Sequence, residues 1–196
     1  VSGTKEDESV VIDLVSGVPQ QKTVAPFDFS TEYKNRTMLC SYSIGNQANR
    51  IDYSVTNAPD VYNGSDSSND GGGSLYFGGE EKITAAKSLY NRFGSNILSM
   101  MLVLKDTETY LLVGSDPDDF VIYPVSKSIG CPAPLTLATG EVNLSGKPTD
   151  GTTRNVAMWI SSSGPIMFDG AAISSIRGME NFFDPNQSEY IEWSAI

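Results

Sequence analysis

The fold is decided by the stretch MMLVLKDTETYLLVGSDPDDFVIYPVS, residues 100–126. Two apolar runs, residues 101–105 and 109–113, flank a polar Asp-Thr turn, and a third run at residues 120–125 follows a Pro-Asp-Asp-Phe loop. Short apolar runs bounded by Gly, Pro and Asp predict β-strands. Because MLVL and YLLV do not alternate between apolar and polar residues, these strands are predicted to be covered on both faces.

The same pattern of strand, polar turn and returning strand occurs on both sides of this stretch. Further strands are expected at residues 10–15, 38–42, 50–55, 156–160, 165–168 and 173–176, and a loop is expected at residues 16–26. The hairpins are separated by roughly 55–65 residues, which exceeds the ~40–45 residues of a compact propeller blade. Insertions between the hairpins account for the difference.

The clearest insertion is SDSSNDGGG, residues 65–73, which has the composition of a flexible loop. A short amphipathic helix is predicted over residues 80–93, and Gly94 is suited to end it. The apolar residues at helical spacing in that segment are Ile83, Ala86, Leu89, Tyr90 and Phe93. A second, shorter helix is expected from Ser174 or Ser175 to Phe183.

An isolated hairpin is marginally stable in water, so the hairpins must pack against one another. The sequence therefore predicts a mostly β fold of antiparallel, β-propeller-like blades with one or two short helices, and a β-sandwich is the alternative. Residues 1–30 are interpreted as an N-terminal strand and linker. Residues 31–185 form the blades, with the inserted loop and helix at residues 65–94, and residues 186–196 are a C-terminal segment.

Three hairpin units do not close a propeller, because known propellers have typically four to eight blades. We expect the rest of the ring to lie outside this segment, which makes the chain an incomplete part of a propeller. Two alternatives are that the chain contains more units than we count, and that neighbouring chains complete the ring.

The composition excludes several classes of protein. With 39% hydrophobic and 19% charged residues, the chain of 196 residues is suited to bury a core and lacks the composition of a disordered protein. The formal net charge is −11, and Lys and Arg are scattered singly. We therefore expect no binding to nucleic acid, whether sequence-specific or not, and no binding to an anionic membrane. No apolar run approaches the roughly 18 residues that span a bilayer.

The chain contains no histidine, which removes the commonest general base and the commonest metal ligand. Catalytic triads that depend on histidine are therefore excluded. The two cysteines, Cys40 and Cys131, are interpreted as buried free thiols, and no disulfide between them is indicated. Asp116, Asp118 and Asp119 cluster beside a proline and are interpreted as a turn. We predict no enzyme activity, no catalytic residue and no cofactor.

One stretch matches the first half of a calcium-binding loop. Asp66, Ser68 and Asp70 are followed by Gly71, at the spacing of oxygen ligands in such loops. Phe77 stands at the twelfth position, where a bidentate glutamate is required. A surface loop is therefore favoured over a calcium site.

Aromatic residues supply the candidate contacts. Trp159 and Phe168 are predicted to face each other across a hairpin, where such a pair stabilises the sheet. The segment FFDPNQSEYIEW, residues 182–193, is apolar enough to dock on a neighbour. The interface candidates in that segment are Phe182, Phe183, Tyr190 and Trp193.

The order of these elements resembles a known family. The series NRTMLC, NRIDYS and APDVYNG, then LVLKDTETYLLVGSDPDDFVIYPVS and IGCPAP, then AMWISSSGPIMFDG, is similar to the propeller core of tailed-bacteriophage tail-nozzle, tail-tubular and packaged-DNA-stabilising hub proteins. The resemblance covers residues 35–184. The Pro-Asp-x-Phe loop, the Gly-Cys-x-Ala-Pro segment and the Phe-Asp-Gly turn are its recurring parts.

The resemblance implies a virion structural protein of the tail or neck, in a ring that connects to the portal and lines or closes the DNA passage. Its implied partners are further copies of the same chain and other tail, neck or portal proteins, and its implied place is the virion, assembled in the bacterial cytoplasm. Two alternatives remain: a propeller module that binds glycans or a host surface, and a hydrolase whose active site needs residues outside this segment.

Overall fold

The computed structural model describes residues 9–13, 20–24, 26–42, 46–62, 71–93, 96–143 and 153–176, together with Gly178 and Asn186. The described residues form three four-stranded antiparallel sheets and a two-stranded hairpin, and their helix is limited to two short 3-10 turns. The strands are β1 (Ser9–Asp13), β2 (Gln20–Val24), β3 (Phe27–Tyr33), β4 (Arg36–Tyr42), β5 (Arg50–Tyr53), β6 (Gly73–Tyr76), β7 (Ile83–Phe93), β8 (Asn96–Lys105), β9 (Thr109–Val113), β10 (Val121–Ser126), β11 (Ala138–Asn143), β12 (Thr153–Ser161), β13 (Gly164–Phe168) and β14 (Ile173–Ser175), and the 3-10 turns are η1 (Pro117–Asp119) and η2 (Pro134–Thr136).

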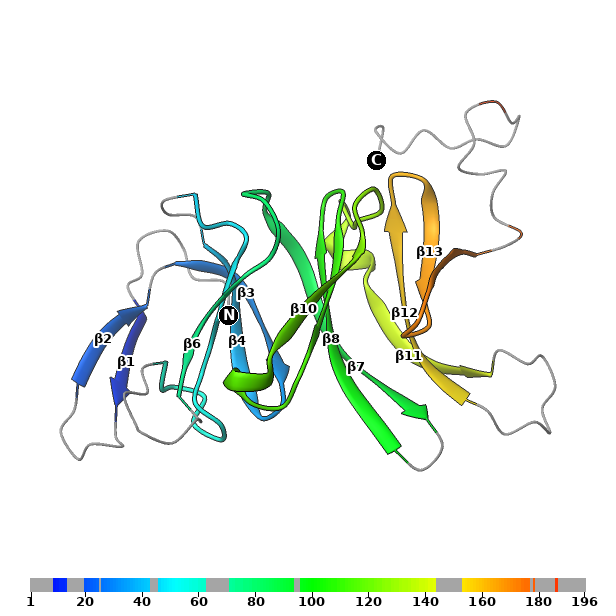
Figure 1. Ribbon diagram of the computed structural model, residues 1–196. Helices are drawn as coiled ribbons and strands as arrows, with labels where there is room; N and C mark the ends of the chain where they lie inside the picture. The colour runs from blue at the N-terminus through cyan, green and yellow to red at the C-terminus, as the bar shows by residue number, and fades with distance from the viewer. Residues whose placement is uncertain are drawn as a thin grey trace.

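Each four-stranded sheet is a meander of consecutive strands. The first sheet is ordered β3-β4-β5-β6, the second β7-β8-β9-β10 and the third β11-β12-β13-β14, and every pairing is antiparallel. Figure 1 shows the three sheets following one another across the molecule in chain order. Each sheet is open, with its first and last strands at its two edges. The prediction of a mostly β, antiparallel fold is confirmed.

The second sheet lies between two apolar cores. In β8, Met101 and Val103 contribute to the core shared with the first sheet, whereas Leu102 and Leu104 contribute to the core shared with the third sheet. All four of these side chains have 0% exposure. Because successive strand residues point to opposite faces, a strand buried on both sides reads as a continuous apolar run. The prediction that MLVL is covered on both faces is confirmed.

Hydrogen bonds fasten the first sheet to the second. Tyr33, at the end of β3, is buried, and its hydroxyl donates to the carbonyl oxygen of Gly114 at 2.8 Å and to that of Ser99 at 3.3 Å. The turn between β3 and β4 consists of two residues, Lys34 and Asn35. Both have positive φ. Two consecutive residues of this kind form the type I′ turn that suits the twist of a hairpin.

The segment after β10 fastens the third sheet to the second. The amide of Cys131 donates to the carbonyl oxygen of Lys105 at 2.7 Å, and the indole Nε1 of Trp159 donates to the carbonyl oxygen of Gly130 at 2.9 Å. A Cβ at Gly130 would lie only 2.3 Å from the Lys105 oxygen. Position 130 therefore has room for a glycine but not for a side chain, and position 131 holds a small buried side chain.

The helix predicted over residues 80–93 is wrong, since β7 occupies Ile83–Phe93. A bulge between Ile83 and Ala85 shifts the register against β8. Ile83, before the bulge, and Ala86, beyond it, join the core with the first sheet, whereas Ala85 and Leu89 join the core with the third. Apolar residues on both faces of a bulged strand imitate the spacing of a helical face, and pairing with β8 decides the conformation.

Other predicted elements also need correction. Residues 16–26 include the strand β2, so the predicted loop is wrong there. Ser174 and Ser175, proposed to begin a second helix, belong to β14, and most of the remainder of that helix lies outside the described residues. Trp159 pairs with Ile166, and Phe168 with Ala157, so the two aromatic side chains are diagonal neighbours in one core rather than directly opposed.

Candidate interaction surface

The first strands of the three sheets lie near one another and form a common edge. The hydroxyl of Ser88 in β7 donates to the carbonyl oxygen of Glu32 in β3. Tyr90, two residues further along β7, hydrogen-bonds through its hydroxyl to the carboxylate of Glu141 in β11. Its amide lies 3.5 Å from Oδ1 of Asn155 in β12. We call this surface, made by β3, β7 and β11, the first-strand edge.

The first-strand edge carries charges of both signs. Asp28, Glu32 and Glu141 are exposed acidic residues on it, and Lys82 and Lys87 are exposed basic residues. Nζ of Lys82 lies 2.8 Å from Oδ2 of Asp28. The net negative charge of the chain is therefore not concentrated here, and the surface has no excess of cations that would bind phosphate groups.

Two hollows open at the first-strand edge. One, of about 550 Å³, lies between the β3–β4 turn and β7 and is lined by polar residues that include Glu32, Asn35 and Lys87. The other, of about 600 Å³, is more apolar and has Phe29 and Leu135 in its walls. Leu135 lies on η2 and is fully exposed. Both hollows are open grooves without a convergent set of catalytic groups in the described residues.

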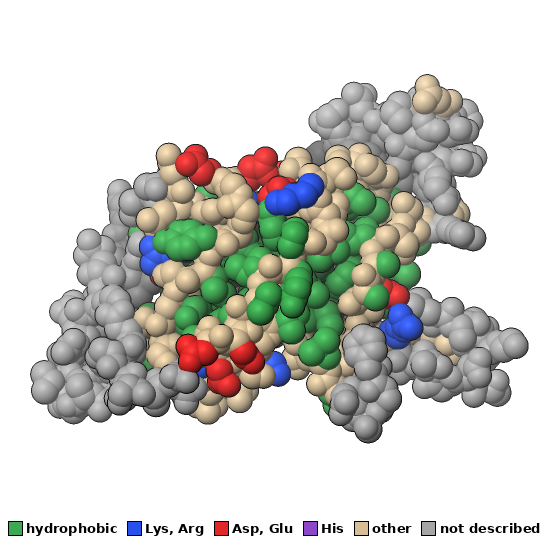
Figure 2. Space-filling model, in the orientation of Figure 1, with side chains coloured by type: hydrophobic (Ala, Val, Ile, Leu, Met, Phe, Trp, Pro, Cys, Tyr) green, Lys and Arg blue, Asp and Glu red, His purple; other side chains and the backbone are tan. Residues whose placement is uncertain are grey.

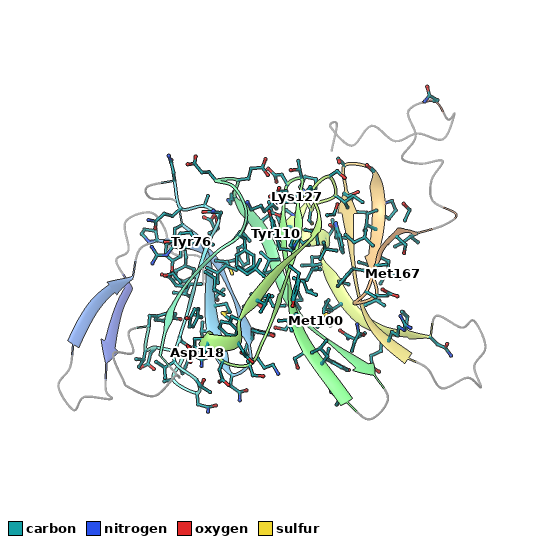
Figure 3. All side chains as sticks on the ribbon, viewed as in Figure 1. Tyr76, Met100, Tyr110, Asp118, Lys127 and Met167 are labelled. Atoms are coloured by element: carbon teal, nitrogen blue, oxygen red, sulfur yellow. The ribbon has the colours of Figure 1, made fainter. Side chains whose placement is uncertain are left out.

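A charged cluster occupies one end of the second sheet, where Figure 3 shows Tyr110 beside Lys127. Nζ of Lys105, which is fully buried, donates to the carbonyl oxygen of Gly79 at 2.7 Å and lies 3.5 Å from Oε2 of Glu108. The same carboxylate accepts the Tyr110 hydroxyl at 2.7 Å and lies 3.0 Å from Nζ of Lys127. The members satisfy one another, and the cluster ties the β8–β9 turn to the loop before β7.

The pKa values of Lys105 and Glu108 are both lowered, but for different reasons. Burial lowers the pKa of Lys105, although the carboxylate of Glu108 opposes that effect. Burial by itself raises the pKa of Glu108, but hydrogen bonds from Tyr110 and Lys127 outweigh it and hold the pKa below its ordinary value. A buried amine already bound to a carbonyl and a carboxylate is not placed to attack a substrate. The cluster therefore has a structural role.

The carboxylates of the Pro-Asp-Asp-Phe loop form a turn, as predicted. Oδ1 of Asp119 accepts the amides of Ser115 at 2.8 Å and Asp116 at 2.7 Å. Asp116 precedes η1, and Gly114 before it has φ +128. The aspartates therefore stabilise the link between β9 and β10, at the end of the sheet opposite Lys127 (Figure 3).

The Phe-Asp-Gly turn between β13 and β14 is built around one aspartate. Oδ1 of Asp169 accepts the amides of Ala171 at 3.0 Å and Ala172 at 2.9 Å, and Oδ2 lies 2.9 Å from Nη1 of Arg154. Burial alone raises the pKa of Asp169, but these amides and the guanidinium outweigh it and lower the pKa. The carbonyl oxygen of Asp169 also accepts the side-chain amide of Asn91 at 2.9 Å, which ties the turn to β7.

The structure describes the two predicted thiols but not the predicted calcium ligands. Cys40 and Cys131 are buried and free, as predicted, and burial raises the pKa of both thiols. The calcium candidates Asp66, Ser68 and Asp70 lie outside the described residues, as do the interface candidates Phe182, Phe183, Tyr190 and Trp193. Within the described ranges, no group of three or more His, Cys, Asp or Glu side chains is placed to hold a metal ion.

The first-strand edge was not predicted from the sequence. Its β3 strand reads FDFSTEY, and the exposure of its residues alternates with period two, which is the signal of a half-buried strand that sequence reasoning missed. Its β7 strand was assigned to a helix. The third member, β11, reads ATGEVN and carries too few apolar residues to give a periodic signal.

The comparisons with protein-family models and with curated proteins identify no relative. No protein-family model matches the chain, and no curated protein matches it significantly in sequence. In the described part of the chain, none of the helical segments has the length and apolar character needed to cross a bilayer. The candidate function therefore depends on the arrangement of the sheets and on the motifs that they contain.

Proposed function

We propose that the chain is a structural protein of a tailed-bacteriophage virion, and that its three sheets are consecutive blades of a propeller-like body in a tail or neck ring. The observation on which this depends is the order of the fold. Three meanders of four consecutive strands share two continuous cores, and their first strands lie together at one edge. Blades of a propeller have this arrangement, with one edge strand of each sheet toward the centre.

The burial of the second sheet supports blades over a sandwich. A sandwich has two sheets with one inner face each, whereas residues 101–104 of β8 in the second sheet are buried on both faces, as the middle of an internal blade must be. Among the described residues, the first and third sheets each pack against one four-stranded sheet. Their other faces are where further blades would pack. On the third sheet that face includes Met158 and Met167, which are directly paired and half-buried.

The role of such a body is mechanical. Two apolar cores and the cross-sheet hydrogen bonds of Tyr33, Trp159 and Asn91 hold the three sheets at fixed positions. An overall charge of −11 disfavours adhesion to DNA that passes nearby. Further copies of the chain and the neighbouring tail, neck or portal proteins are the proposed partners, and no enzymatic step is assigned to the described residues.

The test is assembly with the products of the adjoining genes. We expect electron-microscopy class averages of the co-expressed proteins to contain rings, and antibodies against the chain to label the tail or neck of particles. Met158→Glu with Met167→Glu should abolish the rings, because two charges would enter the face where the next blade packs. Ser162→Glu, on an exposed residue of the turn between β12 and β13, is the control and should leave them intact. A chain that stays monomeric with these partners and binds glycans on an array would refute the proposal.

A further inference from the structure

The outer strands of the second sheet carry an apolar surface. Val121 and Tyr123 in β10 pair with Val113 and Leu111 in β9. Paired residues share a face of the sheet, and both β9 residues belong to the core with the third sheet. All four side chains therefore point to the same side. We call these four residues the apolar shelf.

The shelf is exposed, although the same face is buried one strand further in. Val121 has 44% and Tyr123 52% of its surface exposed, whereas Met100, which pairs with Val113 from β8, has 1%. The third sheet therefore covers the inner part of this face and leaves the outer part open. Figure 2 shows an apolar surface in the middle of the view, over β10 and continuing toward the third sheet. An exposed apolar surface at the edge of a sheet marks an interaction site.

Charges of opposite sign stand at the two ends of β10. Asp116 and Asp118, both exposed, precede the strand at η1, and the exposed Lys127 follows its last residue. Figure 3 shows Asp118 and Lys127 at opposite ends of the second sheet. Nζ of Lys127 lies 3.0 Å from Oε1 of Glu108, yet the Lys127 side chain stays 60% exposed. It is therefore accessible to a second carboxylate.

This pattern is complementary to itself under a two-fold rotation. When two copies of β10 lie antiparallel, the acidic end of each faces the basic end of the other. The midpoint between positions 118 and 127 falls beside Tyr123, so the two shelves then meet across the axis. A parallel arrangement would instead bring like charges together. We propose that the apolar shelf is the contact surface of a two-fold dimer of this chain, with Asp118 of each copy facing Lys127 of the other.

The two copies meet through side chains and not through a shared sheet. β10 contains Pro124, which has no N–H to donate, and its pairing with β9 shifts between Pro124 and Ser126. Proline and irregular pairing protect the edge of a sheet against a further strand. The shelf is the part of β10 that remains available to a second copy.

The size of the surface indicates a dimer of moderate affinity. The exposed parts of the four shelf residues offer on the order of 300 Å² per copy, and a standard interface takes about 800 Å² from each partner. The charged residues at both ends of β10 supply the polar rim that surrounds the apolar centre of such interfaces. We therefore expect micromolar dissociation. The dimer does not rest on the proposed function, because the faces where further blades would pack belong to the first and third sheets.

Sedimentation equilibrium of the full chain at micromolar concentrations tests the proposal. Tyr123→Glu should raise the dissociation constant of the dimer about tenfold or more, because two like charges would meet beside the axis. Tyr76→Glu is the matched control and should leave it unchanged, since Tyr76 has the same exposed fraction of 52% but lies on β6 of the first sheet. A chain that stays monomeric, or equal effects of the two variants, would overturn the proposal. Loss of the dimer in Met158→Glu with Met167→Glu would assign the contact to the third sheet instead.

Reversal of one rim charge tests the antiparallel arrangement. In Asp118→Lys, like charges would face each other across the interface, and the dissociation constant should rise about threefold, although the chain becomes less negative. Asp28→Lys makes the same change of charge on β3, at the first-strand edge, and is the matched control. It should not raise the constant. An Asp118→Lys variant that dimerises as well as the control would overturn the arrangement.

Photo-crosslinking locates the axis. With p-benzoylphenylalanine in place of Tyr123, which keeps an aromatic ring at the position, covalent dimers should form, and mass spectrometry should place the crosslink in residues 121–127 of the second copy. The same probe in place of Tyr76 should give no covalent dimer. The absence of covalent dimers from residue 123, or crosslinks from it to other parts of the second copy, would overturn the two-fold contact.

Discussion

Substitution of Gly130 tests how closely the third sheet is attached to the second. A Cβ at this position would lie 2.3 Å from the carbonyl oxygen of Lys105 and 2.6 Å from the carbonyl carbon of Asp106. Both are backbone atoms of the end of β8 and its turn, so a flexible side chain cannot move aside to make room. In Gly130→Ala, the backbone of the Gly-Cys segment must shift away from β8.

The expected cost depends on the contacts that the shift disturbs. Overpacking of a well-packed site costs about 1–3 kcal/mol. The shift also weakens two hydrogen bonds, Cys131 amide to Lys105 at 2.7 Å and Trp159 to Gly130 at 2.9 Å, each worth about 0.5–1.5 kcal/mol. We therefore expect Gly130→Ala to lower the free energy of unfolding by roughly 2–6 kcal/mol, a large share of the stability of an ordinary domain.

Urea unfolding, followed by tryptophan fluorescence, measures this change. Gly140→Ala is the matched control, because a Cβ at Gly140, in β11, meets nothing within 4 Å, and alanine there should change the free energy of unfolding by less than about 0.5 kcal/mol. If the Gly130 and Gly140 variants were equally stable, the close approach of residue 130 to β8 would be incorrect, and with it the attachment of the third sheet.

Three further predictions concern the core, the Phe-Asp-Gly turn and the thiols. Leu102→Ala should lower the free energy of unfolding by about 2–5 kcal/mol in the same urea titration. Leu135→Ala, on a fully exposed residue, should change it by less than about 0.5 kcal/mol. Similar values for the two variants would contradict the burial of β8 on both faces. The folded-state pKa of Asp169 lies below its ordinary value of 3.8, so the carboxylate stabilises the fold fully above pH 3.8 and loses this effect as the pH falls through the folded-state pKa. Asp169→Asn should therefore flatten the acid side of the profile of stability against pH, measured by thermal unfolding. An unchanged profile would count against the hydrogen bonds of this turn. Native Cys40 and Cys131 should resist iodoacetamide, because both thiols are buried with raised pKa values, and both should react in urea; rapid labelling of the folded protein would disprove their burial.

Apolar runs gave a reliable account of the inner strands. The strand predicted at residues 109–113 has the same bounds as β9, and the run at residues 101–105 falls within β8. These segments combine strong β-propensity with unambiguous burial, so local preference and tertiary packing agree. Edge strands are different, because β3, β6 and β11 have exposed residues along their length and contain no continuous apolar run.

The prediction of a helix over residues 80–93 is wrong because of the bulge in β7. Without coordinates, Ile83, Ala86 and Leu89 satisfy the helical period, whereas Ile83 and Ala86 face one core and Leu89 the other. The partner that settles the matter is β8, the next strand along the chain. Propensity is a weak prior in such a case, because the strand pairing determines which faces are buried.

The candidate surface was less accessible to prediction than the fold. The first-strand edge exists because three segments far apart in sequence are brought together by face-to-face packing, and no local pattern encodes that packing. The turn at Asp116 and Asp119 was predictable because the sequence alone sets its geometry. The phage assignment depends on the order of motifs, and assembly with the products of the adjoining genes is its test.

The meander order of the sheets has a consequence for how the protein is made. Within each four-stranded sheet, the strands pair in chain order, so each of these sheets is complete once its own four strands have left the ribosome. Local closure of this kind favours fast, stepwise folding during synthesis. The same modularity gives evolution a simple unit to duplicate, since a newly added sheet needs to match one existing face and leaves the hydrogen bonding of every earlier sheet intact.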